Sequence, residues 1–353
     1  MTIEFEKKSS VSSLAALFPG QGSQFVGMGK DLYDNFSYVK QLFEEASDAL
    51  RFDLKKLCFE GSESDLTLTE NTQPCLLTAS VAAFRVAEKE LNFLPAAVAG
   101  HSLGEYSALV AAQSIPFSVA IQWVRERGLA MQKAVPAGEG TMAAILGLED
   151  AAIERLCKTA TETAKEKRNQ QEAPELRVKP IVQPANFNAP GQVVIAGSID
   201  AVQEAIQLVK AGSAGDFPGG KAIALNVSAP FHCELMYPAK ERMKEVFALL
   251  DHSQKPKQPF CAYVPNRTAR LTEEAGVIEE LLIEQIDHPV LWKHSMLSLL
   301  DSGFSTFIEF GPGKVLCGLM KRIATNPPRK CTLHALGDTA SLKAYESMLK
   351  MAS

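Results

Sequence analysis

No hydrophobic run in this sequence approaches the roughly 18 residues that a membrane-spanning helix requires. The N-terminus carries acidic residues early and has no apolar core followed by a small-residue cleavage site, so we expect no secretory signal peptide. Both absences argue against contact with a membrane.

Cysteine and histidine are sparse and show no metal-binding spacing. The seven cysteines are scattered, odd in number and never spaced as C-x-x-C, which argues against a disulfide framework and a zinc knuckle. The six histidines form no H-E-x-x-H motif. We therefore expect a reducing compartment, the cytoplasm, and no metal.

Neither sign of charge is in large excess, since 41 acidic residues against 36 Lys and Arg give a formal net charge of -5. That balance provides no overall attraction to phosphate, so we expect no nucleic-acid partner. Apolar residues, by contrast, are plentiful at 46%, which argues against disorder. At about 150 residues per domain, the 353 residues predict two domains or one large domain with an insertion.

Helical and extended patterns alternate along the whole chain, which predicts an α/β fold. The middle of the chain follows the order β-α-β-β-α-β, which is typical of a ferredoxin-like unit. We predict that this unit is a small inserted domain at 138–225, and that 1–137 and 226–353 form the two parts of a larger domain. Its expected elements are strands at 141–148, 180–187, 192–197 and 221–227, with helices at 150–167 and 200–210. The charged stretch 161–180 is expected to be a solvated helix end and loop.

The strongest local motif is GHSLG at 100–104, between a predicted strand at 96–99 and a predicted helix from Glu105. G-x-S-x-G in that context is typical of a nucleophile elbow, whose sharp turn exposes the hydroxyl of Ser102. The following helix points its N-terminus at developing negative charge, and the N–H of Leu103 is a natural oxyanion donor. An ordinary glycine-rich turn between strand and helix is the alternative.

A serine nucleophile requires a base, and His232 is the best candidate. It is predicted to end a strand and to begin a loop, which is a usual place for a general base. His101 adjoins the serine and cannot easily fold back onto it. No Asp or Glu between Ser102 and His232 is a convincing third member. The residues therefore predict a Ser–His dyad whose imidazole is oriented by a group other than a carboxylate.

Two further segments carry candidate binding groups. FPGQGSQ at 18–24 follows a predicted strand, and its glycines free backbone N–H groups for contact with an anion. Its spacing fits neither a Walker motif nor a dinucleotide fingerprint. Arg127, in WVRERG at 123–128, is able to fork onto a carboxylate. A solvated helix position is the alternative for Arg127 and the better interpretation for Arg125.

Together these segments resemble the malonyl-CoA:acyl-carrier-protein transacylases, the acyltransferases of fatty acid and polyketide synthesis. The match follows the family order and covers nearly the whole chain. The matching segments are 18–29 (FPGQGSQFVGMG), 71–77 (NTQPCLL), 100–112 (GHSLGEYSALVAA), 125–132 (RERGLAMQ), 185–197 (ANFNAPGQVVIAG), 228–236 (SAPFHCELM), 285–292 (QIDHPVLW) and 309–323 (EFGPGKVLCGLMKRI). The resemblance implies an α/β-hydrolase-like large domain with a ferredoxin-like insert.

The resemblance also implies roles for individual residues. Ser102 would carry the acyl group as an ester, and His232 would act as its base. The backbone N–H groups of Gln21 and Leu103 would form an oxyanion hole, and Arg127 would pair with the carboxylate of a malonyl group.

Four more positions match residues around the family's site. Gln285 matches a residue whose backbone carbonyl holds the histidine, which would explain the missing acid. His101 and Asn188 match residues that line the site. Phe231, directly before the base, is expected to crowd a 2-methyl group and so to favour malonyl over methylmalonyl.

The implied reaction is ping-pong transfer of malonyl from malonyl-CoA to the phosphopantetheine thiol of a holo acyl carrier protein, by a monomer that needs no cofactor. Because carrier proteins are acidic, a chain of net charge -5 must gather positive charge locally, and the candidates are Lys221, Lys314, Lys321 and Arg322. The alternatives are a serine hydrolase that acts on carrier-bound acyl groups and a non-catalytic carrier-binding scaffold.

Overall fold

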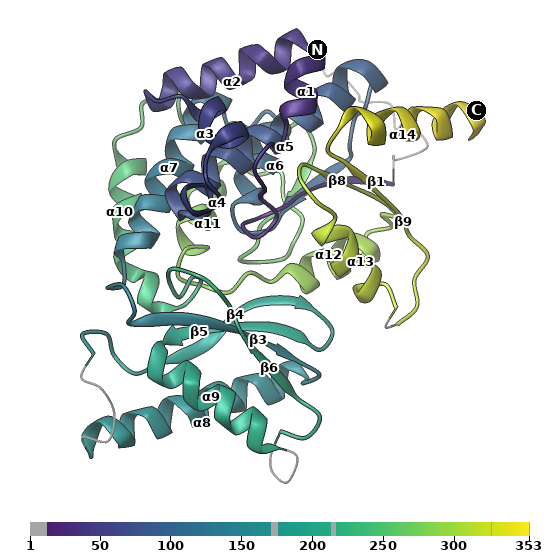
Figure 1. Ribbon diagram of the computed structural model, residues 1–353. Helices are drawn as coiled ribbons and strands as arrows, with labels where there is room; N and C mark the ends of the chain where they lie inside the picture. The colour runs from purple at the N-terminus through teal and green to yellow at the C-terminus, as the bar shows by residue number, and fades with distance from the viewer. Residues whose placement is uncertain (1–12, 171–175, 213–216, 326, 353) are drawn as a thin grey trace, which may run out of the picture.

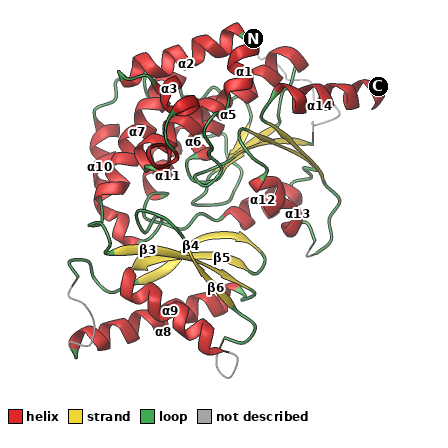
Figure 2. Ribbon diagram, viewed as in Figure 1, coloured by secondary structure: helices red, strands yellow, loops and turns green. Residues whose placement is uncertain are grey.

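The computed structural model describes residues 13–170, 176–212, 217–325 and 327–352. These residues form a five-stranded and a four-stranded sheet that lie in separate parts of the molecule (Figures 1 and 2). Part of the N-terminal segment that argued against a signal peptide, 1–12, lies outside the described residues, as does 171–175 of the charged stretch.

The larger sheet is parallel throughout, in the order β7-β2-β1-β8-β9. Its strands are β1 (Leu14–Phe18), β2 (Ala97–Gly100), β7 (Ala262–Val264), β8 (Thr306–Phe310) and β9 (Thr332–Leu336). Central strand β1 is buried on both faces, which is why it consists of consecutive apolar residues without alternation. Phe18 packs into the core on one face, and Leu17 packs into the core on the other.

Helices cover both faces of this sheet (Figure 2). One face packs mainly against α2, α5, α6 and α7, and the other against α12 and α13. The helices of this part are α1 (Lys30–Asn35), α2 (Ser37–Leu50), α3 (Leu54–Glu60), α4 (Glu63–Thr67), α5 (Thr69–Leu91), α6 (Gly104–Ala111), α7 (Phe117–Lys133), α10 (Tyr237–Ala248), α11 (Ile278–Glu284), α12 (Trp292–Asp301), α13 (Val315–Ile323) and α14 (Thr339–Ala352). This layering agrees with the predicted α/β-hydrolase-like part.

The smaller sheet is antiparallel, in the order β4-β5-β3-β6. Its elements are β3 (Gly140–Leu146), α8 (Asp150–Asn169), β4 (Val182–Ala189), β5 (Gln192–Ser198), α9 (Ile199–Ala211) and β6 (Lys221–Ala224). Helices α8 and α9 lie side by side on one face and share a separate apolar core with the sheet (Figure 1). The predicted fold class, with a ferredoxin-like unit inside an α/β chain, is therefore confirmed. The domain boundaries at 137/138 and 225/226 stay a prediction.

The last strand of the small sheet is shorter than the expected strand at 221–227. Among the described strands it pairs with β3 alone, the register ends at Ala143 and Ala224, and one further backbone hydrogen bond joins Leu225 N–H to the Met142 carbonyl oxygen. Further on, Pro230 has no N–H to donate to a ladder. The prediction that His232 ends a strand is therefore wrong, because His232 lies in a turn well beyond β6, with a φ of 60°.

None of the helices within the described ranges is long and apolar enough to cross a membrane. Over the same ranges, no group of three or more His, Cys, Asp or Glu side chains is arranged to hold a metal ion.

Candidate active site

Ser102 lies in the sharp turn between β2 and α6. Its φ of 53° is in the left-handed region, which side-chain-bearing residues rarely adopt. The glycines on either side are required by close backbone contacts: a Cβ on Gly104 would lie 2.1 Å from the carbonyl oxygen of Phe18, and one on Gly100 would lie 1.9 Å from the backbone of Gly104. The strand, strained turn and helix are the arrangement of a nucleophile elbow.

The hydroxyl of Ser102 meets the imidazole of His232. Ser102 Oγ lies 2.7 Å from His232 Nε2, and His232 Nδ1 lies 2.8 Å from the backbone carbonyl oxygen of Gln285. A carbonyl oxygen only accepts hydrogen bonds, so Nδ1 carries the proton and Nε2 is left to accept one. The imidazole is thus oriented by a backbone carbonyl where a triad would have a carboxylate.

Burial keeps this imidazole neutral. His232 is 3% exposed. Burial first, and the neighbouring Arg127 guanidinium second, lower the pKa of His232 to about 3. A neutral imidazole is the form that accepts a proton from a hydroxyl.

The side chain of Arg127 extends from α7 to the hydroxyl of Ser102. Its Nη2 lies 3.1 Å from Ser102 Oγ and 2.7 Å from Gln285 Oε1, and its Nη1 donates to Gln73 Oε1 at 2.9 Å. The residue is 1% exposed, and burial lowers its pKa. Among the described residues no carboxylate lies within 4.0 Å of its guanidinium. A buried cation held by neutral amides is suited to bind an anionic ligand.

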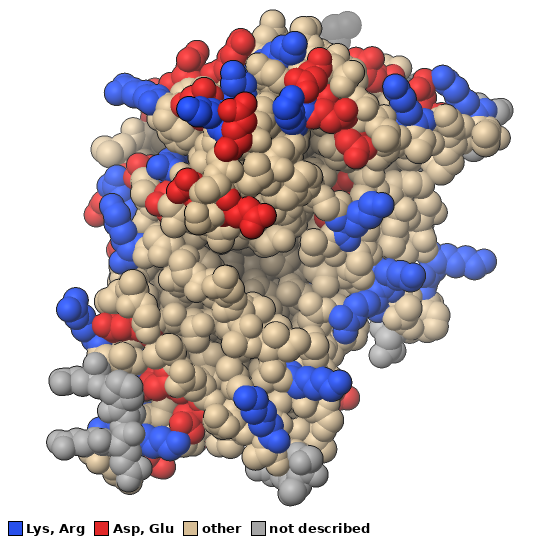
Figure 3. Space-filling model, in the orientation of Figure 1, with Lys and Arg blue, Asp and Glu red and all other residues tan. Residues whose placement is uncertain are grey.

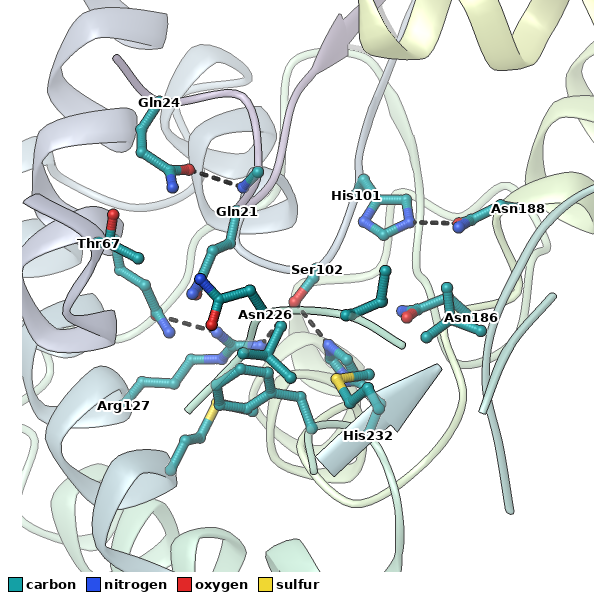
Figure 4. Close-up of a pocket in the computed structure, with 18 residues that line it drawn as sticks. Gln21, Gln24, Thr67, His101, Ser102, Arg127, Asn186, Asn188, Asn226 and His232 are labelled. Atoms are coloured by element: carbon teal, nitrogen blue, oxygen red, sulfur yellow. Dashed lines mark hydrogen bonds between the residues drawn. The ribbon is translucent and has the colours of Figure 1, made fainter. Parts of the chain in front are cut away.

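A cavity of about 330 Å³ opens in front of these groups (Figure 4). Its polar wall includes His101 and Asn188, whose Nε2 and Oδ1 lie 2.8 Å apart. Its lining residues are Gln21, Gly22, Gln24, Thr67, Gln73, His101, Ser102, Arg127, Met131, Met142, Asn186, Asn188, Val194, Leu225, Asn226, Val227, Phe231 and His232. The cavity therefore combines one cation, several amides and an apolar wall.

The residues that the sequence assigned to an acyl site converge on this cavity. Gln21 and Phe231 line it, and Gln285 lies directly behind His232 and Arg127. Within the part of the chain that the structure describes, the backbone N–H groups of Gln21 and Leu103 have no hydrogen-bond acceptor. They are free to bind an oxyanion.

The four cations predicted to bind a carrier do not line the cavity. Lys221 begins β6, Lys314 precedes α13, and Lys321 and Arg322 lie in its last turn. All four are exposed. In Figure 3 basic side chains lie below and to the right of the central hollow, on the sides where Figure 1 draws β6 and α13.

Comparison with known proteins identifies the family of this chain. The chain matches the model of the acyl transferase domain over residues 16–333. It belongs to the acyl transferase family. The resemblance that the sequence motifs carried is thereby confirmed, and the protein is an acyltransferase.

Three relatives are similar to this acyltransferase over most of their length. It is 45% identical to a malonyl CoA-acyl carrier protein transacylase of Bacillus subtilis, over 89% of this chain and 91% of the relative. An acyl carrier protein S-malonyltransferase of Vibrio cholerae superposes with a TM-score of 0.83 and 43% identity, over 95% of this chain and 100% of the other. A malonyl-transacylase solved in complex with its type II polyketide synthase acyl carrier protein superposes with a TM-score of 0.82 and 41% identity, over 94% and 98%.

Several polar residues of the acyltransferase site were missed by sequence reasoning. Gln73 lies inside the matching segment 71–77, and Glu105 directly follows the elbow, so both were within motifs already singled out. Asn266 follows β7, at the carboxyl edge of the parallel sheet where sites gather, and that position was a usable signal. Arg125 is partly buried against Glu70 O and Asn71 Oδ1 and does not line the cavity.

Proposed function

We propose that this acyltransferase transfers a malonyl group from malonyl-CoA to the phosphopantetheine thiol of a holo acyl carrier protein. The observation that carries the proposal is the buried Arg127 guanidinium, 3.1 Å from the hydroxyl that His232 contacts at 2.7 Å. A short acyl chain with a terminal carboxylate fits a cavity with a nucleophile and an unpaired cation side by side. The names of its relatives support malonyl as that acyl group and a carrier protein as the acceptor.

In the first half-reaction Ser102 Oγ attacks the thioester carbonyl carbon while His232 Nε2 takes the hydroxyl proton. Negative charge develops on the carbonyl oxygen, and the free N–H groups of Gln21 and Leu103 are available to stabilise it. Collapse of the tetrahedral intermediate expels the CoA sulfur, which receives the proton from His232. The malonyl group remains as an ester on Ser102.

In the second half-reaction the carrier's thiol takes the place of the hydroxyl. His232 removes the thiol proton, the sulfur attacks the ester carbonyl, and the proton returns to Ser102 Oγ as the ester bond breaks. One thioester has been exchanged for another, so the overall reaction is close to isoenergetic. The chemistry therefore requires neither a redox step nor an added energy source.

To test the proposal, the protein is mixed with labelled malonyl-CoA and a holo carrier. We expect label to pass through the protein to the carrier. Release of free malonate without transfer would instead identify a serine hydrolase, and failure of the protein to take up covalent label would leave only a carrier-binding scaffold.

The pH dependence of the first half-reaction follows from the state of the imidazole. Because the pKa of His232 is lowered to about 3, the neutral base persists at pH values where an ordinary histidine is protonated. We expect the acid limb of kcat/KM for malonyl-CoA to lie well below about pH 6.5, measured by stopped-flow release of CoA over the pH range in which the protein stays folded. An acid limb at the ordinary histidine pKa would contradict this.

Phe231 is expected to set the tolerance for a branched acyl chain. Its buried ring lines the cavity directly before the base. Phe231→Ala should lower the preference for malonyl-CoA over methylmalonyl-CoA by about tenfold, since one extra carbon in a tight pocket is worth about 1–3 kcal/mol. The ratio of the two kcat/KM values checks this, and an equal preference in the variant and the unmodified protein would show that another wall excludes the methyl group.

We also propose that Lys221, Lys314, Lys321 and Arg322 attract the acidic carrier. They are exposed and belong to elements on two sides of the cavity entrance in Figures 1 and 3. Exposed cations act mainly on the association rate and are screened by salt.

A further inference from the structure

A buried carboxylate lies behind the reacting groups without touching them. Glu105, on the first turn of α6, is 0% exposed and does not line the cavity. Its Oε2 accepts a hydrogen bond from Gln285 Nε2 at 2.7 Å and another from the backbone N–H of Asn266 at 3.0 Å. This one oxygen therefore links the elbow helix to the loops that follow α11 and β7.

The first of these partners, Gln285, contacts both functional side chains. Its backbone carbonyl holds His232 Nδ1 at 2.8 Å, and its side-chain Oε1 accepts from Arg127 Nη2 at 2.7 Å. An amide has one accepting end and one donating end. The donating end binds Glu105 Oε2 at 2.7 Å and, more weakly, the backbone carbonyl oxygen of Ser102 at 3.0 Å, so the accepting end faces Arg127. With the amide reversed, its NH₂ would face the donors of the guanidinium.

The second partner, Asn266, is bound to the elbow itself. Its Oδ1 accepts from the backbone N–H of Ser102 at 2.6 Å, and its Nδ2 donates to the carbonyl oxygen of Gly100 at 2.6 Å. These contacts brace the strained turn from the side of β7. The backbone of Asn266 is in turn fixed by Glu105.

Burying the Glu105 carboxylate costs folding free energy. Burial raises the pKa of Glu105 to about 7, and its Oε1 has no hydrogen-bond partner among the described residues. An apolar side chain of similar volume would avoid that cost. Its two hydrogen bonds are made to Gln285 and Asn266, which both contact residues around the reacting atoms. We therefore expect the carboxylate to orient these residues.

We propose that Glu105 is a positioning residue whose accepting oxygen orients Gln285, and thereby both the base His232 and the carboxylate-binding Arg127. The inference rests on the proposed malonyl transfer. It predicts that loss of this oxygen weakens selection for a carboxylate as well as the rate. A merely structural role would lower the active fraction and leave the selectivity of each active molecule unchanged.

The test is the ratio of single-turnover acylation rates with malonyl-CoA and acetyl-CoA. Glu105→Met fills the volume but removes the acceptor, and we expect the ratio to fall about tenfold or more, since small misplacement of a binding group has effects of that size. Glu105→Gln retains an accepting oxygen and should keep the ratio within about threefold of the unmodified protein. Should Glu105→Met fail to fold, Glu105→Asp, which withdraws the carboxylate by one methylene, serves the same comparison.

Glu309 provides a matched control. It is equally buried, but its oxygens accept from the backbone N–H groups of Leu316 and Cys317 at the start of α13. Glu309→Met should lower stability and leave the ratio unchanged. The inference is overturned if Glu105→Met keeps the ratio, or if Glu105→Gln loses as much as Glu105→Met. Failure of the unmodified protein to take up malonyl label would overturn the proposed function instead.

Discussion

Replacing Ser102 with alanine is expected to abolish covalent labelling by malonyl-CoA and to lower transfer to the carrier by about 10⁴-fold or more. The reason is geometric: Ser102 Oγ is the hydroxyl 2.7 Å from the neutral imidazole, and it lines the same cavity as the Arg127 cation. Without that oxygen no ester forms, and only binding of the two substrates in one place remains. Intact-mass spectrometry after mixing with malonyl-CoA measures the ester, and a radiolabel on the carrier measures transfer.

Ser107 supplies the control for this substitution. It lies on α6, the helix that follows the elbow, and is buried at 1% exposed, and its Oγ has no hydrogen-bond partner among the described atoms. Ser107→Ala should therefore retain labelling and transfer. A Ser102→Ala protein that still acquires a malonyl adduct at another residue would refute the proposed ester.

Replacing Arg127 with alanine is expected to have the second largest effect on the rate. The size of this effect should depend on the acyl group that the CoA thioester carries. Removing one partner of a buried, hydrogen-bonded charge pair costs about 3 kcal/mol, or roughly 150-fold in kcat/KM for malonyl-CoA. Acetyl-CoA has no carboxylate to pair, so its rate should fall much less or rise. The preference for malonyl over acetyl should consequently collapse by about two orders of magnitude.

Two neighbouring variants sharpen that result. Arg125→Ala removes a partly buried arginine on the same helix that donates to Glu70 O and Asn71 Oδ1, so it should leave the preference unchanged. Arg127→Lys keeps the charge but loses the planar fork that holds Gln73 and Gln285 together, and we expect an intermediate preference. If Arg127→Ala preserved the malonyl-to-acetyl ratio, the carboxylate would have to bind elsewhere.

The elements that the sequence predicted best are those with a local cause. The helix at 150–167 is α8 (Asp150–Asn169), and the strand at 192–197 is β5 (Gln192–Ser198). Hydrophobic periodicity within each segment is sufficient to identify such elements. The end of β6 was placed too late, because the chain leaves its partner after Leu225: β3 continues to Gly140, but the last backbone hydrogen bond between the two runs from Leu225 N–H to the Met142 carbonyl oxygen.

In the site, too, the local motifs were predictable and the contacts between distant segments were not. Its individual residues were proposed from short motifs, but their mutual contacts join distant parts of the chain: Ser102 and His232 are 130 residues apart, and Arg127 and Gln285 are 158 apart. The strand that His232 was expected to end stops eight residues earlier, at Ala224, and the histidine still reaches the serine because its turn packs against Gln285.

By itself the sequence determined the elbow, since the approach of Gly100 to the backbone of Gly104 and the left-handed Ser102 between them are constraints within five residues; the contact of Gly104 with Phe18 of β1 is tertiary. The sequence also determined the alternation of helix and strand that yields two sheets. The resemblance implied the Gln285 carbonyl behind His232, but only the tertiary structure decided that neutral amides hold Arg127 and that Glu105 lies behind both side chains. Those contacts depend on which loops the parallel sheet brings to one edge, and no local pattern of residues specifies that meeting.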